Sequence, residues 1–151
     1  MTDFIFSLGY FGLFLISFLG ATLVPLATEV FVIGMARVGY HIWWVMITAT
    51  LGGFVGNLVN YYVGLKGTDF VLSRYIKINE KTWARAEKMF QKYGVVALFF
   101  SWLPIVGDPL TIVAGAFHTK MTVFTFWVIL GKFLRYIVLL GLANRLLDAL
   151  A

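Results

Sequence analysis

The sequence contains no cysteine and only two histidines, His41 and His118. Without cysteine the chain can form no disulfide, no thiolate nucleophile and no cysteine-based metal site. Two histidines are too few for a histidine-rich metal site. The sequence also lacks a nucleotide-binding glycine loop, a nucleophile elbow and a zinc motif. We therefore expect no metal, no other cofactor and no enzymatic activity.

Charged residues are scarce: they make up 13% of the 151 residues, whereas 61% are hydrophobic. Soluble domains typically contain about 25% charged and about 45–50% apolar residues. A chain of this length has too little interior to bury such an apolar excess, because a small domain has much surface. A lipid bilayer is the natural solvent for it. We predict a single all-α integral membrane domain over residues 1–151, multi-pass in the cell inner membrane.

The first part of the chain is almost free of charge, with only Glu29 and Arg37 between residues 4 and 65. It divides into three apolar segments, at residues 4–20, 26–37 and 42–65. The second segment is shorter than the roughly 20 residues that cross a bilayer. We therefore predict that the first two segments form a re-entrant helical hairpin broken at Pro25, followed by a transmembrane helix. The N-terminus lacks the basic region of a secretory signal, so we expect the first segment to be retained.

The segment 66–93 carries most of the positive charge behind the net charge of +5. It holds seven of the twelve basic residues: Lys66, Arg74, Lys77, Lys81, Arg85, Lys88 and Lys92. The positive-inside rule places it in the cytoplasm, and its charge suits anionic lipid headgroups rather than nucleic acid. Its second half, from a cap at Asn79 to Gly94, has the pattern of an amphipathic helix. The apolar stripe of this helix consists of Trp83, Ala86, Met89, Phe90 and Tyr93. We expect this stripe to lie on the membrane surface, with a solvated connector helix as the alternative.

A second apolar region, 95–117, is interrupted at Pro104, Gly107 and Pro109. These breaks predict a second re-entrant hairpin. The last long apolar segment, 121–148, is long enough to cross the bilayer completely. The second half of the chain therefore repeats the plan of the first, a hairpin followed by a transmembrane helix.

The two halves also share a weak internal repeat at an offset of 79 residues. Residues 25–29 and 104–108 both read proline, three residues, acid. The same offset aligns four further identical pairs: Ile33 with Ile112, Leu51 with Leu130, Gly52 with Gly131, and Phe54 with Phe133. Because a cytoplasmic segment separates the halves, their transmembrane helices must run in opposite directions, as in the inverted repeats of secondary transporters. We predict repeat one at 1–66, the cytoplasmic linker and amphipathic helix at 67–93, and repeat two at 94–151.

Two acids, Glu29 and Asp108, lie in otherwise apolar segments directly after the predicted breaks. A carboxylate within hydrocarbon is costly, so it usually faces a cavity or a partner. In a substrate or proton pathway each acid could bind and release protons. Alternatively each acid caps the half-helix that follows its break, since acids are favourable at helix N-termini. The sequence leaves both interpretations open, and both can hold together.

Three cations also fall within apolar segments: Arg37, Lys132 and Arg135. Lys132 and Arg135 are three residues apart, so they share a helix face. There they could pair with the acids or bind a phosphate headgroup, arginine through a bidentate contact and lysine as a point charge. For Arg37 the alternative is that its long side chain reaches the membrane interface.

Asn57, Asn60 and Trp102 complete the candidate pathway residues. The two asparagines share one face of the predicted span at 42–65, which also carries several glycines. Such a face favours close helix packing, with lining of the pathway as the alternative. Trp102 lies two residues before Pro104, within the second break.

The chain resembles the DedA (VTT-domain) membrane proteins, in particular the short YqaA-like branch. The resemblance extends over nearly the whole chain and rests on residues 21–25 with Glu29, 48–52, 92–94, 101–108 and 131–136. The run Ser-Trp-Leu-Pro-Ile-Val-Gly-Asp at 101–108 is the specific part of it. The resemblance implies two re-entrant hairpins that face each other, membrane-embedded acidic and basic residues, and lipid translocation.

Members of this family are implicated in recycling undecaprenyl phosphate, and eukaryotic relatives in phospholipid scrambling. The better-known branch carries an arginine-bearing motif in its second hairpin, where this sequence has Trp102 and Asp108. Lys132 and Arg135 could supply the positive charge instead.

These features together predict a flippase or scramblase for a phosphate-bearing lipid, with protons as the candidate coupling ion. The alternatives are a proton- or cation-coupled exporter of a small solute, and a non-transporting membrane scaffold. The expected partners are membrane lipids, an anionic or phosphate-bearing lipid being the candidate substrate. A homo-oligomer is compatible with the sequence.

Overall fold

The computed structural model describes residues 2–21, 27–66, 80–103 and 106–150, and every regular element in these ranges is helical. In chain order the helices are α1 (Thr2–Gly20), α2 (Ala27–Val38), α3 (Ile42–Leu65), α5 (Glu80–Tyr93), the 3-10 helix η1 (Gly94–Trp102), α6 (Gly107–Ala116) and α7 (Met121–Leu150). The all-α prediction is confirmed. The predicted spans at 42–65 and 121–148 coincide with α3 and α7 to within two residues.

Two of the described helices, α3 and α7, are long and apolar enough to cross a membrane. With 24 and 30 residues and a rise of about 1.5 Å per residue, they reach about 36 and 45 Å, more than the roughly 30 Å of a hydrocarbon core. The 12 residues of α2 reach only about 18 Å. Gly39 follows α2 with a φ of 102°, and Gly94 begins η1 directly after α5 with a φ of 63°. This backbone conformation favours glycine.

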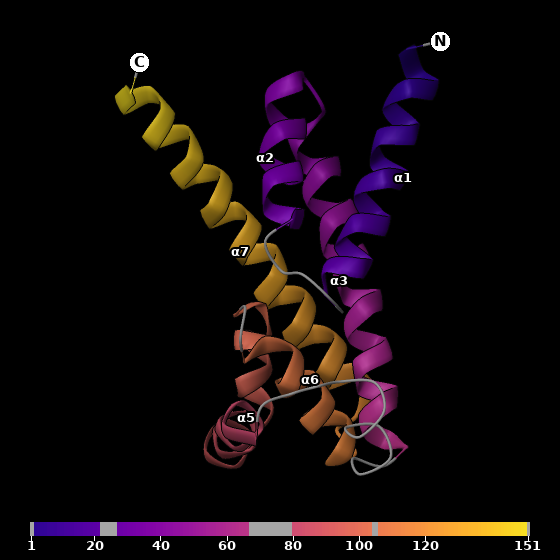
Figure 1. Ribbon diagram of the computed structural model, residues 1–151, viewed down its shortest axis with the longest axis vertical. Helices are drawn as coiled ribbons and strands as arrows, with labels where there is room; N and C mark the ends of the chain where they lie inside the picture. Colours follow the sequence, from indigo (N-terminus) through magenta and orange to yellow (C-terminus); the bar gives the residue numbers. More distant parts are fainter. Residues whose placement is uncertain (1, 22–26, 67–79, 104–105, 151) are drawn as a thin grey trace.

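The short helices lie at opposite ends of the molecule (Figure 1). α1 and α2 occupy the half that holds both chain ends, whereas α5, η1 and α6 occupy the other half. α3 and α7 run through both halves in opposite directions. Each half contains its own hydrophobic cluster, one including Leu13, Val45 and Leu140, the other including Leu98 and Phe124.

The amphipathic helix α5 packs differently from the sequence prediction. The stripe predicted to lie on the membrane surface turns its centre toward the protein, where Ala86 and Phe90 are buried in the cluster with η1 and α6. The Phe90 ring stacks on Phe117, with 5.2 Å between centroids. Only Tyr93, at the end of the stripe, is half exposed. The apolar stripe is present as predicted, but protein covers its centre, because η1 begins at Gly94 and packs back on α5.

Close helix approach depends on two glycines that the repeat offset pairs. A Cβ atom on Gly52 would collide with the carbonyl oxygen of Phe14 on α1. A Cβ atom on Gly131 would collide with the carbonyl oxygen of Phe99 on η1. Small residues at such contacts let helix backbones pack directly on each other, as is common in membrane proteins. α3 therefore packs on α1 at Gly52, and α7 packs on η1 at Gly131.

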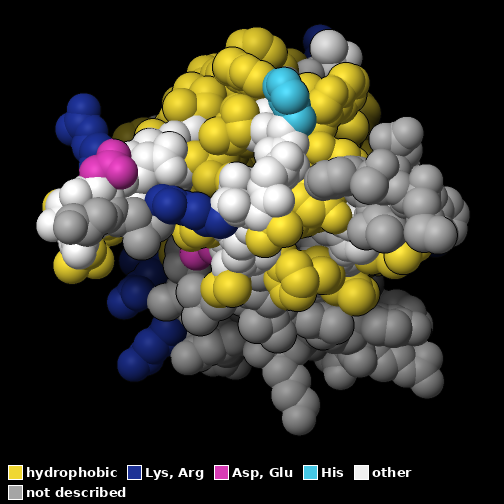
Figure 2. Space-filling view, turned by 90° about the horizontal axis from the view of Figure 1, so that it is seen from above, with side chains coloured by type: hydrophobic (Ala, Val, Ile, Leu, Met, Phe, Trp, Pro, Cys, Tyr) yellow, Lys and Arg dark blue, Asp and Glu magenta, His cyan; other side chains and the backbone are white. Residues whose placement is uncertain are grey.

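Hydrophobic side chains also cover much of the outside. Viewed from the end that holds the termini, most described side chains on the surface are apolar, and charged groups are few (Figure 2). The exposed set includes Phe11, Trp44, Phe126, Val138 and Leu142. A surface of this kind is suited to lipid rather than to water.

Candidate functional site

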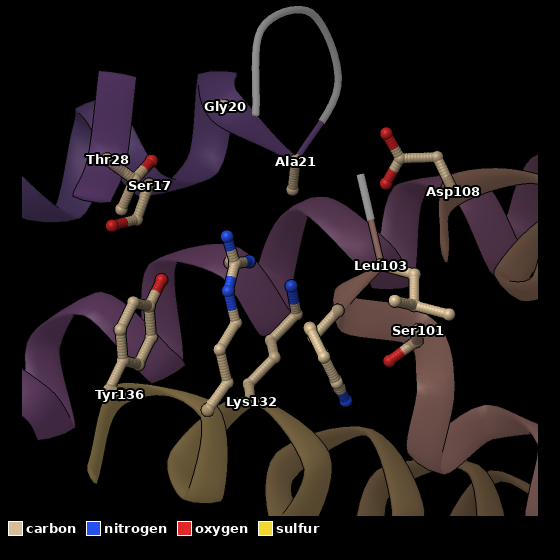
Figure 3. Close-up of a pocket in the computed structure, with 12 residues that line it drawn as sticks. Ser17, Gly20, Ala21, Thr28, Ser101, Leu103, Asp108, Lys132 and Tyr136 are labelled. Atoms are coloured by element: carbon tan, nitrogen blue, oxygen red, sulfur yellow. The ribbon is translucent and has the colours of Figure 1, made fainter. Parts of the chain in front are cut away.

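A polar cavity lies where α1 and η1 end and where α2 and α6 begin (Figure 3). Its walls come from six helices and consist of Ser17, Gly20, Ala21, Thr28, Gly53, Ser101, Trp102, Leu103, Asp108, Lys132, Arg135 and Tyr136. The volume is about 30 Å³, which is room for roughly one or two water molecules. Three of the predicted charged residues, Asp108, Lys132 and Arg135, thus meet in one place.

Lys132 extends from α7 into this cavity (Figure 3) and is only 7% exposed. Its side chain lies against Gly53 of α3, where a Cβ atom would stand 3.2 Å from Nζ. Within the described residues its ammonium group has neither a hydrogen bond nor an ion-pair partner. An ammonium group buried without a partner is costly. The position is therefore suited to binding an anion.

Asp108 stands in the first turn of α6, and its carboxylate faces the same cavity from the side opposite α7 (Figure 3). The Thr111 hydroxyl donates a hydrogen bond of 2.7 Å to the Asp108 backbone carbonyl, which fixes this turn. No ion pair joins Asp108 to Lys132 in the described structure. The two opposite charges face each other across the cavity and attract through it.

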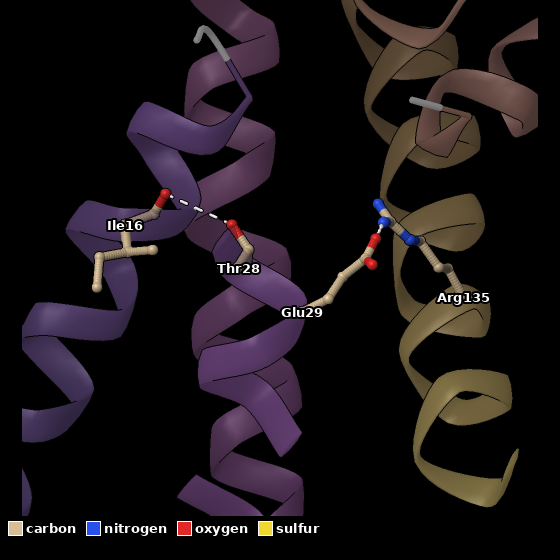
Figure 4. A network of polar contacts seen from close by, with 4 residues as sticks. All are labelled: Ile16, Thr28, Glu29 and Arg135. Atoms are coloured by element: carbon tan, nitrogen blue, oxygen red, sulfur yellow. Dashed lines mark hydrogen bonds and ion pairs between the residues drawn. The ribbon is translucent and has the colours of Figure 1, made fainter. Parts of the chain in front are cut away.

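Glu29 and Arg135 form an ion pair between α2 and α7 (Figure 4). Their side chains are 24% and 16% exposed, respectively. Glu29 stands in the first turn of α2. The neighbouring Thr28 hydroxyl donates a 3.5 Å hydrogen bond to the Ile16 carbonyl of α1, so the start of α2 is held against α1. Arginine pairs well with carboxylates and phosphates alike, because its planar donors match both.

Trp102 lies beside this ion pair. The Arg135 guanidinium is 6.0 Å from the centre of the Trp102 ring and 5.9 Å from that of Tyr136. Both distances are at the limit of a cation–π contact. The aromatic rings therefore help to hold Arg135 at the mouth of the cavity.

An apolar groove of about 420 Å³ adjoins the ion pair on its other side. Its walls are hydrophobic except for the ion pair itself and comprise Glu29, Phe99, Trp102, Gly131, Leu134, Arg135, Val138, Leu139 and Leu142. Trp102 and Arg135 line both the groove and the polar cavity. The Arg135 side chain thus separates a small polar space from a larger apolar one.

Three of the other predicted pathway residues lie elsewhere. Arg37 is exposed and lines a separate pocket of about 260 Å³ with Asn144. Asn57 and Asn60 are buried in α3 and do not line the cavity. Neither polar atom of the Asn57 side chain, nor Nδ2 of Asn60, has a hydrogen-bond partner in the part of the chain that the structure describes.

The predicted helix breaks are only partly visible. Pro25 and Pro104 fall outside the described residues. Gly107 and Pro109 are both buried in the first turn of α6. A Cβ atom on Gly107 would collide with the carbonyl oxygen of Ser101. Gly107 therefore lets α6 begin directly against the end of η1.

Four polar cavity residues, Ser17, Thr28, Ser101 and Tyr136, are absent from the sequence prediction of the pathway. All four are buried. Isolated hydroxyl groups within apolar helices are a weak signal, since they often bond to their own backbone. No group of three or more acidic or histidine side chains that could hold a metal ion occurs in the described ranges.

Comparison with known proteins adds an independent result. A family model of the VTT domain matches residues 24–144. Inner membrane protein YqaA of Escherichia coli (strain K12) is 38% identical over 132 residues, which cover 87% of this chain and 88% of that protein. An uncharacterized protein of Haemophilus influenzae is 30% identical over 143 residues, covering 89% of this chain and 87% of that protein.

A third relative is Undecaprenyl phosphate transporter A of Staphylococcus aureus, 33% identical over 141 residues, which cover 85% of this chain and 68% of that protein. No solved structure matches the chain. The match to the VTT domain spans most of the sequence, and the relatives are matched over most of their own lengths. The chain therefore belongs to the VTT-domain (DedA) family of membrane proteins and is YqaA-like.

Proposed function

We propose that this protein moves a phosphate-bearing lipid across the cytoplasmic membrane, as a flippase or scramblase. The observation that carries the proposal is the position of Lys132, a buried cation without a partner in the described structure, in one cavity with Arg135 and Asp108. An anionic headgroup would supply the missing partner. The printed name of the Staphylococcus aureus relative, an undecaprenyl phosphate transporter, supports a lipid of this class.

The proposal includes two inverted repeats whose hairpins enter the membrane from opposite sides. Its main support is a contact between equivalent positions: the offset of 79 residues that aligns the acids also pairs Gly53 with Lys132, and these two residues touch. When two repeats are related by a two-fold axis, a residue can contact the corresponding residue of the other repeat only if both lie next to that axis. The axis would then pass between α3 and α7 through the polar cavity, where binding sites of inverted-repeat transporters lie.

The same relation accounts for the difference between the two acids. The residue equivalent to Arg135 in the first repeat is Gly56. Glu29 therefore has an arginine partner from the other repeat, whereas the position that corresponds to Arg135 in the first repeat has no side chain that could pair with Asp108. Asp108 is left facing Lys132 across the cavity, available to exchange a proton or to balance the cations when no headgroup is bound.

The cavity must open before it can hold a headgroup, since its present volume of about 30 Å³ accommodates only water. The Glu29–Arg135 ion pair lies between the cavity and the apolar groove, so it is the contact that has to separate. A phosphate could replace the Glu29 carboxylate as the partner of Arg135, because both groups accept paired hydrogen bonds from a guanidinium. The headgroup would then reach Lys132 while its chain stays in lipid.

We place the basic segment 66–93 in the cytoplasm and the turn between α2 and α3 on the outer side. Seven of the twelve basic residues lie in that segment, which supports this orientation through the positive-inside rule. α3 would run from outside to cytoplasm and α7 from cytoplasm to outside.

Reconstitution tests the proposal. Purified protein in liposomes should move a labelled polyprenyl phosphate or anionic phospholipid faster than empty vesicles, and Lys132→Met should abolish the movement. Ile137→Met, on an exposed part of α7 outside both pockets, is the matched control and should behave as wild type. No movement above empty vesicles for any anionic lipid would count against the proposal.

The small size of the cavity favours one second candidate, a proton- or cation-coupled exporter of a small solute. That activity predicts flux which follows the proton gradient without any lipid movement. A scaffold is distinguished by Glu29→Gln and Asp108→Asn together. A scaffold shows only a loss of assembly or stability with these changes, whereas a transporter loses flux while it remains folded, even with the lower stability expected for Glu29→Gln.

A further inference from the structure

We propose that the apolar groove along α7 binds the hydrocarbon chain of the transported lipid while its phosphate meets Arg135. This inference rests on the proposed function and extends it from the headgroup to the rest of the substrate. The occupant is a phosphate-bearing lipid with one hydrocarbon chain lying against α7. A small anion without a chain would use the polar cavity alone.

The first reason is continuity between the two spaces. Arg135 and Trp102 line both the polar cavity and the groove. A molecule that binds in both places must combine an anionic group with an apolar body. The groove meets the second requirement, since its lining is apolar apart from the Glu29–Arg135 pair.

The second reason is the direction of the groove. Its α7 residues extend on both sides of Arg135, with Gly131 toward one end and Leu142 toward the other. Measured from Arg135, the groove extends about 6 Å toward Gly131 and about 10 Å toward Leu142, less than the roughly 15 Å of one leaflet's hydrocarbon. The groove can therefore hold the part of a chain next to the headgroup on either side of Arg135, while the rest of the chain extends into lipid.

The third reason is that the groove is formed by close packing. Gly131 lets the η1 backbone at Phe99 lie directly on α7. Phe99 therefore forms one wall of the groove. Leu134, Val138 and Leu142 form the other wall and are 38%, 58% and 55% exposed. Their spacing of four residues places them along one helix face. A continuous apolar strip of this kind is unpartnered within the described chain.

Charge selects among lipids. Among the described residues that line the groove, Glu29 is the one acid, and Arg135 already neutralises it. A neutral lipid offers Arg135 nothing to replace Glu29, whereas a phosphate does. The groove should therefore bind a chain with a phosphate and should not retain the same chain ending in a hydroxyl.

Photocrosslinking of the full chain in nanodiscs tests this. The probe is farnesyl phosphate with a diazirine on its chain, and the matched probe is the corresponding farnesol. Crosslinks from the phosphate probe should map to Leu134, Val138 and Leu142, and the alcohol should give few. Val138→Trp should lower crosslinking about tenfold, equivalent to about 1.4 kcal/mol, whereas Ile137→Trp on the neighbouring face should not.

The outcomes separate this inference from the proposed function. Crosslinks that map elsewhere, or that are equal for alcohol and phosphate, overturn the groove even if liposomes containing the protein move lipid. Lipid movement that Val138→Trp leaves at the wild-type rate also overturns it. If crosslinks map to the groove and respond to Val138→Trp but no lipid moves in liposomes, the groove stands and the transport proposal fails.

Discussion

Lys132 of α7 lies directly against Gly53 of α3, with its Nζ 3.2 Å and its Cε 3.4 Å from where a Cβ atom on Gly53 would be. The glycine provides the space in which the lysine side chain reaches the polar cavity. The space beside Gly53 therefore accommodates a buried ammonium group that has no partner among the described residues. Such an arrangement costs stability, which is typical of sites retained for function.

Enlarging Gly53 should displace the Lys132 side chain. We expect Gly53→Ala to slow lipid movement several-fold and Gly53→Leu to abolish it, with a loss of about 1–3 kcal/mol of stability for the larger residue through overpacking. The measurements are lipid flux in liposomes and the thermal unfolding midpoint in detergent. Gly12→Ala, where no atom lies within 4 Å of the added group, is the control and should change neither.

Removing the Lys132 charge should separate function from stability. Lys132→Met keeps much of the side-chain volume but removes the buried charge, so we expect unchanged or higher thermal stability together with loss of lipid flux. Lys132→Arg keeps the charge in a larger group and should retain part of the flux. A Lys132→Met variant that transports at the wild-type rate would contradict a headgroup role for this residue.

The Glu29–Arg135 pair should respond to charge reversal. Either Glu29→Gln or Arg135→Gln leaves one charge unpaired, and we expect a loss of about 1–3 kcal/mol, between the values for exposed and buried pairs. The double reversal Glu29→Arg with Arg135→Glu should recover stability because the pair forms again. It should not recover lipid flux, since the cation then stands on α2. Equal stability of all four proteins would show that the pair does not form.

Packing between α3 and α6 should tolerate no side chain at Gly64. A Cβ atom there would collide with the carbonyl oxygen of Ile112, which is backbone and cannot turn away. We expect Gly64→Ala to lower stability by about 2 kcal/mol or more and to reduce the yield of folded protein. Gly34→Ala, at a position with no atom within 4 Å, should be neutral or slightly stabilising. A wild-type melting curve for Gly64→Ala would contradict this contact.

The orientation can be tested cleanly because the chain has no cysteine of its own. Lys88→Cys in α5 and His41→Cys before α3 are both at exposed positions. We expect a membrane-impermeant maleimide added to intact cells to label the cysteine at position 41 and not the one at 88. Permeabilised cells should show labelling of both. The reverse pattern would contradict the cytoplasmic assignment of the basic segment.

The helix positions could be read from the sequence because each depends on local information. The apolar lengths of 42–65 and 121–148 and the glycines at positions 39 and 94 determine where helices begin and end, whatever surrounds them. The acids at the starts of α2 and α6 followed from the same local pattern. The family resemblance added the expectation of two hairpins that face each other and of membrane-embedded acidic and basic residues.

Which side chains meet was decided only by the tertiary structure. The sequence could not choose between Glu29 and Asp108 as the partner of Arg135, nor show that Arg37 lies at a separate pocket. The sequence also predicted that the apolar stripe of α5 lies on the membrane surface, whereas η1 and α6 cover the centre of this stripe. The physical reason is that partners depend on the rotation and axial position of each helix, and a uniformly apolar helix carries little information about either. Those are fixed by glycine contacts with the backbone, such as Gly52 with Phe14 and Gly131 with Phe99.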